Sequence, residues 1–300
     1  MRAGLLATVM MSAMSVSAFA ADPPSIMSAP ASDVPSVYAP PEPPGENEGA
    51  NNGGVNVDLT VKYLTDDVYR GVSHDRAIGG DTHASNFQAD TKFTFNFGNF
   101  PHPYFGVFTN VADSDPVSRF QEIRPYIGVN YTLRPLIFDV SHISYIYPER
   151  ERLDPSPNSS EVIFKLTLDD SYYFLTPRPV LSPYVSGAYD YDRNKGWYLE
   201  AGLKHDFVFE DISCTLTTYG DVAYISNFAQ QFILTSPQDS GFQHWDLGLI
   251  GDLSVTDLLK IPPRYGNLSV QGYFTYTGRF DNDVLANSVL WGGVGIHFKY

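Results

Sequence analysis

The sequence predicts an all-β protein, a transmembrane antiparallel up-and-down β-barrel of about twelve strands. Three observations lead to this fold class. From Val55 onward apolar and polar side chains alternate, as in VNVDLTVKY, and a period of two residues is typical of strands. Short and long connections follow one another along the chain. The chain also ends on an aromatic residue, Tyr300, within an alternating segment.

The alternating pattern divides the chain into segments of strand length. We expect strands at roughly 55–70, 86–97, 103–112, 119–133, 136–147, 160–169, 181–192, 197–209, 212–224, 243–255, 267–278 and 288–300. An even number of strands would leave both ends of the barrel domain on the same, periplasmic, side of the membrane.

The connections differ in length in the way that an outer-membrane barrel requires. Arg134-Pro135 and Glu210-Asp211 predict tight turns, and 98–102 is short, whereas 72–85, 148–159 and 225–242 are long and polar. Two further connections, about 170–180 and 256–266, are longer than this pattern predicts. Short turns at one end and long loops at the other favour a barrel.

Two segments precede the barrel domain at 55–300. Residues 1–20 predict a cleaved signal peptide, because Arg2 is followed by an apolar run and by Ala18-Phe19-Ala20. Residues 21–54 are rich in proline, which fixes φ and lacks an N–H donor, so we expect a disordered periplasmic linker. The chain is therefore expected to be exported and to reside in the outer membrane.

Composition excludes several classes of protein. Cys214 is the only cysteine, so an intrachain disulfide is impossible. Without Arg2 the exported chain has 18 basic and 34 acidic residues, a net charge of about −16, which argues against binding nucleic acid. The chain has no phosphate-binding glycine loop, Cys-x-x-Cys or dinucleotide fingerprint, and we expect no cofactor.

A soluble β-sandwich is the main alternative fold, because it also contains many short alternating strands. Aromatic residues at strand ends argue against it, since a membrane barrel places them in interfacial girdles. The residues concerned are Tyr145, Tyr147, Tyr172, Tyr173 and Trp197. Charged residues also occupy the polar face of nearly every strand, which suits a wet lumen.

The last residues resemble a known assembly signal. Gly295-x-x-Phe298-x-Tyr300 is similar to the C-terminal strand of bacterial outer-membrane barrels, which ends on an aromatic residue and is read by the barrel assembly machinery. The resemblance implies that Gly295, Phe298 and Tyr300 direct the chain to that machinery.

Two stretches resemble the TorF-like porins, a group of Gram-negative outer-membrane proteins. One is Tyr69-Arg70-Gly71-Val72-Ser73, an aromatic–Arg–Gly–aliphatic–Ser run. The other is Tyr145, Tyr147 and Pro148 followed by Glu161. The resemblance is clearest over about 55–170 and departs from the pattern at Asp67, where the group has an aromatic residue. It implies a porin-like barrel.

The polar faces of the expected strands supply candidate pore-lining residues. They are Asp58, Lys62, Arg70, Asp90, Lys92, Glu122, Arg124, Asp139, Glu161, Lys165, Glu200, Lys204 and Asp252. Both signs are present, so no strong ion selectivity is predicted. Continuing the first strand to residue 70 places Arg70 in the lumen, paired with Asp90 or Glu122, or free to attract anions; Gly71 would then leave the strand with positive φ. Trp291 would lie on the inner face of the last strand.

Enzymatic alternatives rest on a few histidines. His142 and Ser144 share a strand face, as in the His-x-Ser pair of outer-membrane phospholipases, but Tyr145-Ile146 stands where those enzymes have Asn-Gly. A protease would need paired carboxylates near a histidine, such as Asp66-Asp67 with His74 or Asp221 near His244. A divalent cation could bind His74, Asp75, Asp81 and His83, but their spacing is irregular, and we expect no metal.

The function that the sequence favours is passive diffusion of small polar solutes through an outer-membrane channel, without enzymatic activity. The alternatives are a lipase-like hydrolase and a non-conducting structural or adhesion barrel. Expected partners are outer-membrane lipids and lipopolysaccharide, periplasmic chaperones and the barrel assembly machinery.

Overall fold

A computed structural model of the 300-residue chain describes residues 54–73, 85–113, 121–148, 158–193, 195–226, 240–280 and 288–300. The expected signal peptide at 1–20, and the linker at 21–54 apart from its last residue, lie outside these ranges. The long strands are β1 (Val55–Leu64), β4 (Ser85–Phe95), β5 (His102–Asp113), β6 (Gln121–Leu133), β7 (Leu136–Tyr145), β8 (Ser159–Leu168), β9 (Tyr184–Asp190), β10 (Gly196–Phe209), β11 (Cys214–Ser226), β12 (Gly241–Ser254), β13 (Asn267–Arg279) and β14 (Val289–Lys299).

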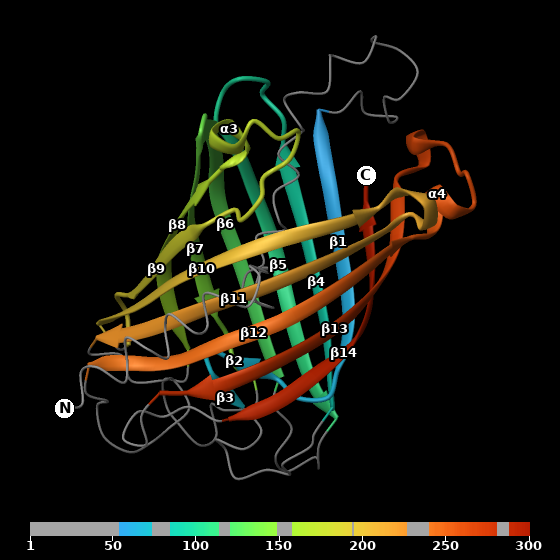
Figure 1. Cartoon of the computed structure of the whole chain (residues 1–300). Helices are drawn as coiled ribbons and strands as arrows, with labels where there is room; N and C mark the ends of the chain where they lie inside the picture. Colours follow the sequence, from blue (N-terminus) through green and yellow to red (C-terminus); the bar gives the residue numbers. More distant parts are fainter. Residues whose placement is uncertain are drawn as a thin grey trace, which may run out of the picture.

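These strands form one closed antiparallel barrel. Each pairs with its neighbours along the chain, in the order β1-β14-β13-β12-β11-β10-β9-β8-β7-β6-β5-β4 (Figure 1). The twelve-stranded up-and-down barrel predicted from the period of two is therefore confirmed. No helix in the described ranges is long and apolar enough to cross a bilayer.

The barrel closes where the first long strand meets the last. Phe298 lies opposite Leu59 and Gly295 opposite Lys62, and β1 and β14 run side by side in Figure 1. The backbone groups of Val57 and Tyr300 exchange hydrogen bonds of 2.6 and 2.8 Å. The terminal residues of the assembly motif therefore form part of this seam.

Alternation along each strand sends apolar side chains outward. In β14, Leu290, Val294 and Ile296 are 57, 60 and 53 % exposed, whereas Trp291 is 4 % exposed and faces the lumen, as expected. An apolar outer face on a closed barrel suits a bilayer, because closure leaves no strand edge in lipid.

The two ends of the barrel differ. One, here the turn end, carries the short connections and the small helices α3 (Ser171–Phe174), η2 (Glu210–Ile212), α4 (Val255–Leu258) and η3 (Pro263–Tyr265). The two connections that seemed long for turns contain α3, and α4 with η3. At the opposite end, here the loop end, β1 ends and β4 begins.

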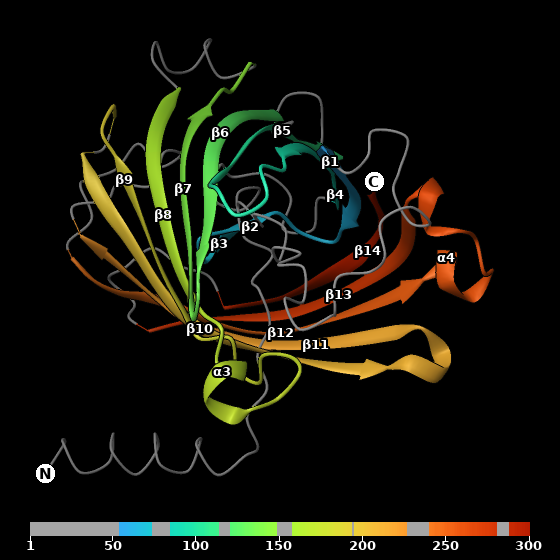
Figure 2. The same ribbon diagram turned by 90° about the horizontal axis from the view of Figure 1, so that it is seen from above.

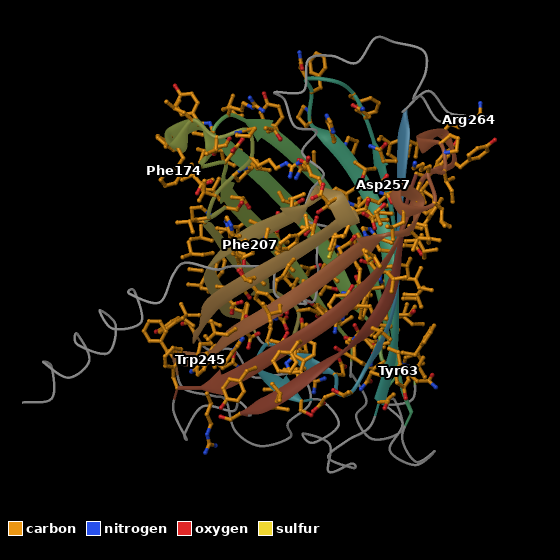
Figure 3. All side chains as sticks on the ribbon, turned by 45° about the vertical axis from the view of Figure 1, so that its right-hand side comes forward. Tyr63, Phe174, Phe207, Trp245, Asp257 and Arg264 are labelled. Atoms are coloured by element: carbon orange, nitrogen blue, oxygen red, sulfur yellow. The ribbon has the colours of Figure 1, made fainter. Side chains whose placement is uncertain are left out.

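Aromatic side chains occur at both ends. In Figure 3, Phe174 lies at the turn end, and Tyr63 and Trp245 lie near the loop end. Tyr172, Tyr173 and Trp197 are exposed, as girdle residues should be. The girdle prediction is wrong for Tyr145 and Tyr147, whose side chains are fully buried. Tyr145 lies on the lumenal face of β7, with Ile143 and Ser141.

The first strand is shorter than predicted, and the chain turns inward after it. Following Leu64, β2 (Val68–Tyr69) and β3 (Val72–Ser73) form a small antiparallel hairpin. Figure 2 shows β2 and β3 inside the ring of long strands. Arg70 and Gly71 have φ of 48° and 73°, and positive φ at both central residues is what a type I′ hairpin turn requires. We call Asp66–Ser73 the lumenal hairpin.

Candidate functional site in the barrel lumen

The lumenal hairpin is buried against the barrel wall near the loop end. One of its two carboxylates joins the two arms of the hairpin, and the other fixes the hairpin to the barrel wall. Asp66 accepts a 2.7 Å hydrogen bond from Ser73 on the other arm of the hairpin. Asp67 accepts hydrogen bonds from Gln88 of β4, at 3.1 Å, and from Asn110 of β5, at 3.2 Å. The position at which the TorF-like pattern has an aromatic residue thus holds a structural carboxylate.

Arg70, at the tip of the hairpin, makes the principal ionic contact. Its Nη1 and Nη2 atoms donate to Oε1 and Oε2 of Glu161 on β8, at 2.8 and 2.6 Å. Both side chains are almost fully buried. Arg70 thus pairs with a lumenal carboxylate, as expected, but the partner is Glu161 and not Asp90 or Glu122. Those two partners assumed that β1 continues to residue 70, whereas the inward turn carries the guanidinium across the lumen.

Aromatic rings enclose this ion pair. The Arg70 guanidinium lies 4.5 Å from the ring centre of Tyr198 and 5.1 Å from that of Tyr69. Tyr69 donates a 2.7 Å hydrogen bond to Tyr145, which donates to Glu161 at 3.0 Å. The residues of both TorF-like stretches therefore meet at one place in the lumen.

A second buried ion pair lies beside the first. Arg124 contacts Glu122 two residues earlier on β6, at 2.5 Å. Its guanidinium also lies 4.3 Å from the ring centre of Tyr69. Tyr69 therefore packs between two arginines, each paired with a glutamate, and a cation over an aromatic face is a favourable contact.

Burial and charge set the protonation states of the hairpin. Burial raises the pKa of the Tyr69 phenol, so this residue stays neutral and can donate to Tyr145. Burial alone would lower the pKa of the Arg70 guanidinium, but the negative charge and hydrogen bonds of Glu161, together with the nearby Tyr69 and Tyr145, outweigh burial and hold that pKa above its usual value. Arg70 is therefore charged at every physiological pH.

The other predicted lumenal carboxylates bind tyrosine hydroxyls or neighbouring polar groups. Tyrosines donate to three of them: Tyr126 to Asp90 at 2.8 Å, Tyr104 to Asp139 at 2.6 Å, and Tyr184 and Tyr198 to Glu200 at 2.9 and 2.8 Å. Asp58 contacts His297 at 2.8 Å, and Asp252 accepts from Ser269 and Gln271. Most acidic groups of the lumen are thus held by hydrogen bonds.

The predicted lumenal lysines lie over tyrosine rings. The Nζ atoms of Lys92, Lys62 and Lys165 are 4.0, 4.7 and 4.3 Å from the ring centres of Tyr104, Tyr273 and Tyr184. Lys204 is half-buried on β10, opposite Tyr219 of β11. Tyrosines thus contact both signs of charge, and these tyrosines are absent from the lumenal residues predicted from the sequence.

A cross-strand pattern could have revealed these tyrosines. Four of them lie directly opposite a glycine on the next strand: Tyr104–Gly128, Tyr126–Gly106, Tyr184–Gly202 and Tyr219–Gly248. A Cβ on Gly128 would lie 2.4 Å from the ring of Tyr104. The missing side chain lets the ring lie over the neighbouring strand. The sequence signal is a tyrosine on the polar face paired with glycine.

The enzymatic candidates are placed differently. Nε2 of His142 lies 2.6 Å from the hydroxyl of Tyr191, and Ser144 lies 3.3 Å from Ser160, so neither contact joins His142 to Ser144. Asp221 and His244 do lie close together, with Asp246 as a third neighbour. Pro148 is exposed just after β7. The residues His74, Asp75, Asp81 and His83 lie outside the described ranges.

Neither a protein-family model nor a curated protein matches the chain. Solved structures do match, over most of its length. LpxR from Salmonella typhimurium has a TM-score of 0.43 at 7 % identity, covering 80 % of this chain and 99 % of that one. OmpF of Salmonella typhi, in complex with daunomycin, has a TM-score of 0.39 at 7 % identity, covering 83 % and 99 %. The translocator domain of the autotransporter NalP from Neisseria meningitidis has a TM-score of 0.38 at 10 % identity, covering 84 % and 90 %.

At TM-scores below 0.5, these solved structures tell us nothing about the fold beyond the strand order that the chain itself shows. The closed barrel, its apolar outer face and its charged interior are themselves the architecture of an outer-membrane β-barrel.

Proposed function

We propose that the chain is an outer-membrane channel through which small polar solutes diffuse passively, and that the lumenal hairpin forms its narrowest part. The observation that carries the proposal is the interior of the barrel. Its wall presents lysines, carboxylates and tyrosine hydroxyls to the lumen, while its outer face is apolar. A channel for polar solutes needs such an interior.

The hairpin defines how wide the passage is. A barrel of twelve strands encloses a narrower passage than the 16–18-stranded porins. The hairpin fills part of that space, and Tyr145, Tyr147 and Glu161 on the wall beside it are fully buried. We infer that only small solutes pass, and that displacement of the hairpin would widen the route.

The charges of the lumen are balanced locally. Asp58 lies opposite Lys92, and Asp139 lies opposite Lys165, on neighbouring strands. Because neighbouring opposite charges compensate one another, we expect only weak selectivity between anions and cations.

The resemblance to the TorF-like porins supports the same function. Four of the residues that carry it, Tyr69, Arg70, Tyr145 and Glu161, meet around one ion pair. Outer-membrane lipids and lipopolysaccharide would then surround the barrel, with delivery by periplasmic chaperones and the assembly machinery. The proposal includes no catalytic step, since His142 and Ser144 each contact another residue.

Single-channel recording in planar bilayers tests the proposal. We expect discrete conductance steps in the wild type that become larger or more frequent in Arg70→Met, which releases the hairpin from Glu161. Lys165→Met is the matched control, because it removes a lumenal positive charge that lies opposite Asp139 on the neighbouring strand. Absence of steps in all three proteins, with insertion confirmed by protease protection, would refute the channel and favour a structural or adhesion barrel.

A further inference from the structure

A second buried cluster lies where β11 pairs with β12. Asp221, His244 and Asp246 are 5, 2 and 7 % exposed. Each offers one oxygen or nitrogen atom, and these three atoms lie within 4.8 Å of one another. The two aspartates are directly opposite each other in the register of the strands, so both carboxylates project from the same face of the barrel wall.

Two carboxylates in directly opposite positions repel each other, and burial strengthens the repulsion. The lumen contains a second such pair, Glu161 and Asp190, on β8 and β9. There Arg70 supplies the compensating positive charge to Glu161. Around Asp246 no ion-pair partner occurs among the residues that the structure describes. Asp246 thus lacks, within the described part of the chain, the compensation that Arg70 gives to Glu161.

The cluster also contains polar atoms without a hydrogen-bond partner. Thr277 hydrogen-bonds the carboxylate of Asp246, but Oδ1 of Asp246 and Nδ1 of His244 have no partner within the described part of the chain. Buried polar atoms nearly always have a hydrogen-bond partner, so a buried polar atom without one calls for an explanation such as a bound ion. Carboxylate oxygens and an imidazole nitrogen are together a set of ligands for a metal ion.

We propose that Asp221, His244 and Asp246 bind a divalent cation, of which Zn²⁺ suits the ligands best. Zinc accepts both imidazole and carboxylate ligands, whereas calcium and magnesium prefer oxygen alone. With metal–ligand bonds of about 2.1 Å, the ligand atoms of a tetrahedral zinc site lie about 3.4 Å apart. The three ligand atoms now lie within 4.8 Å of one another, so the side chains would close around the ion, with water as the fourth ligand.

This site shares one wall with the lumenal hairpin. The ring of His244 stacks on Tyr198, with ring centres 6.2 Å apart, and the guanidinium of Arg70 lies 4.5 Å from the centre of the same Tyr198 ring. A Cβ on Gly71 would lie 2.4 Å from Cγ of His244, so the hairpin backbone packs directly against the imidazole. The hairpin therefore limits the movement of the one nitrogen ligand, and binding of the cation depends on its docked position.

Isothermal titration of ZnCl₂ into the purified, chelator-treated full-length barrel in detergent tests the proposal without requiring that the channel conduct. We expect one equivalent to bind. His244→Gln and Asp246→Asn each remove a ligand. Substitution of a residue that only orients a ligand weakens metal binding by about 10- to 100-fold, so loss of a ligand should weaken it by more than about 100-fold. His297→Gln is the control, because it removes another lumenal histidine that contacts a carboxylate, Asp58, at 2.8 Å; it should leave binding unchanged.

Each outcome decides the question. Absence of binding to the wild type, or retention of wild-type affinity in Asp246→Asn, overturns the site. Retention in His244→Gln overturns it too, since the zinc would then occupy other residues. If both variants fail to fold, as judged by migration of unheated samples on a denaturing gel, Co²⁺ absorption of the wild type decides. Visible bands of a cobalt ion with a nitrogen ligand support the site, and the spectrum of aqueous cobalt refutes it.

Discussion

Breaking the Arg70–Glu161 ion pair should undock the lumenal hairpin while leaving the barrel closed. The pair is bidentate, with contacts of 2.8 and 2.6 Å, and both side chains are almost fully buried. Removing one partner of a buried pair leaves an uncompensated charge and costs about 3–5 kcal/mol. The twelve strands hold one another through their own backbone ladders, so we expect this loss to appear at the hairpin first.

The two single variants should differ in how much free energy each substitution costs. Arg70→Met leaves Glu161 ionised opposite Asp190, so its cost should be close to about 5 kcal/mol. Glu161→Gln retains an oxygen that accepts from Arg70 and Tyr145, so its cost should be close to about 3 kcal/mol. The double variant removes both charges. Its cost should therefore be smaller than the sum of the two single costs by up to about 3 kcal/mol, the coupling energy of the pair.

Trp291 offers an assay for docking, because it packs in one cluster with Val68 of the hairpin. With Trp197 and Trp245 changed to phenylalanine, acrylamide quenching of the remaining tryptophan reports how exposed that cluster is. A loss of about 3 kcal/mol increases the undocked population about 150-fold. We expect quenching to rise in both single variants and to fall back in the double variant.

A different pattern would refute this reasoning. If Arg70→Met and Glu161→Gln each left quenching and the urea midpoint within the error of the wild type, the ion pair would not hold the hairpin. If the double variant cost the sum of the singles, the two residues would act independently, and their contact would be incidental.

Three further predictions concern single positions. Gly71→Ala should destabilise the protein in urea unfolding by well over about 1 kcal/mol, because φ is +73° and the new Cβ would lie 2.4 Å from His244. Gly98→Ala is the control, because φ is +67° there and no atom lies within 4 Å of the new Cβ, so it should cost only the conformational part. Equal costs for the two variants would contradict the packing argument. Deletion of Phe298–Tyr300 should remove most of the protein from the outer-membrane fraction, as measured by immunoblotting, and normal levels would count against the assembly signal. Ser144→Ala should leave single-channel conductance unchanged, and any lipase activity lost with it would revive the hydrolase alternative.

The strands could be predicted from the sequence because their signal is local. Each long strand alternates between lipid and lumen, and an apolar residue on every second position is visible without knowing the neighbouring strand. In β14, for example, Leu290, Val294 and Ile296 face outward as the pattern indicates. The direction of Trp291 follows from the same period.

The candidate site could be predicted only in part, because its contacts join distant segments. Arg70 and Glu161 are 91 residues apart, and their meeting depends on the hairpin leaving the strand pattern after Leu64. The alternation fails between Leu64 and Asp67, but a break in the pattern does not show in which direction the chain turns. The Arg-Gly pair between Val68-Tyr69 and Val72-Ser73 is a two-residue hairpin signal that could have shown the turn. The partner of Arg70 still required the register of the barrel.

The seam between β1 and β14 also has a consequence for the order of assembly. Thr65, the residue that leads from β1 into the lumenal hairpin, exchanges hydrogen bonds of 2.8 and 3.1 Å with Gly292 of β14. Val68 of the hairpin belongs to the same buried cluster as Trp291, the preceding residue of that strand. The strand that arrives last during synthesis is therefore the one that completes the hairpin's binding surface. We therefore expect closure of the wall and completion of the hairpin's docking surface to be coupled during assembly.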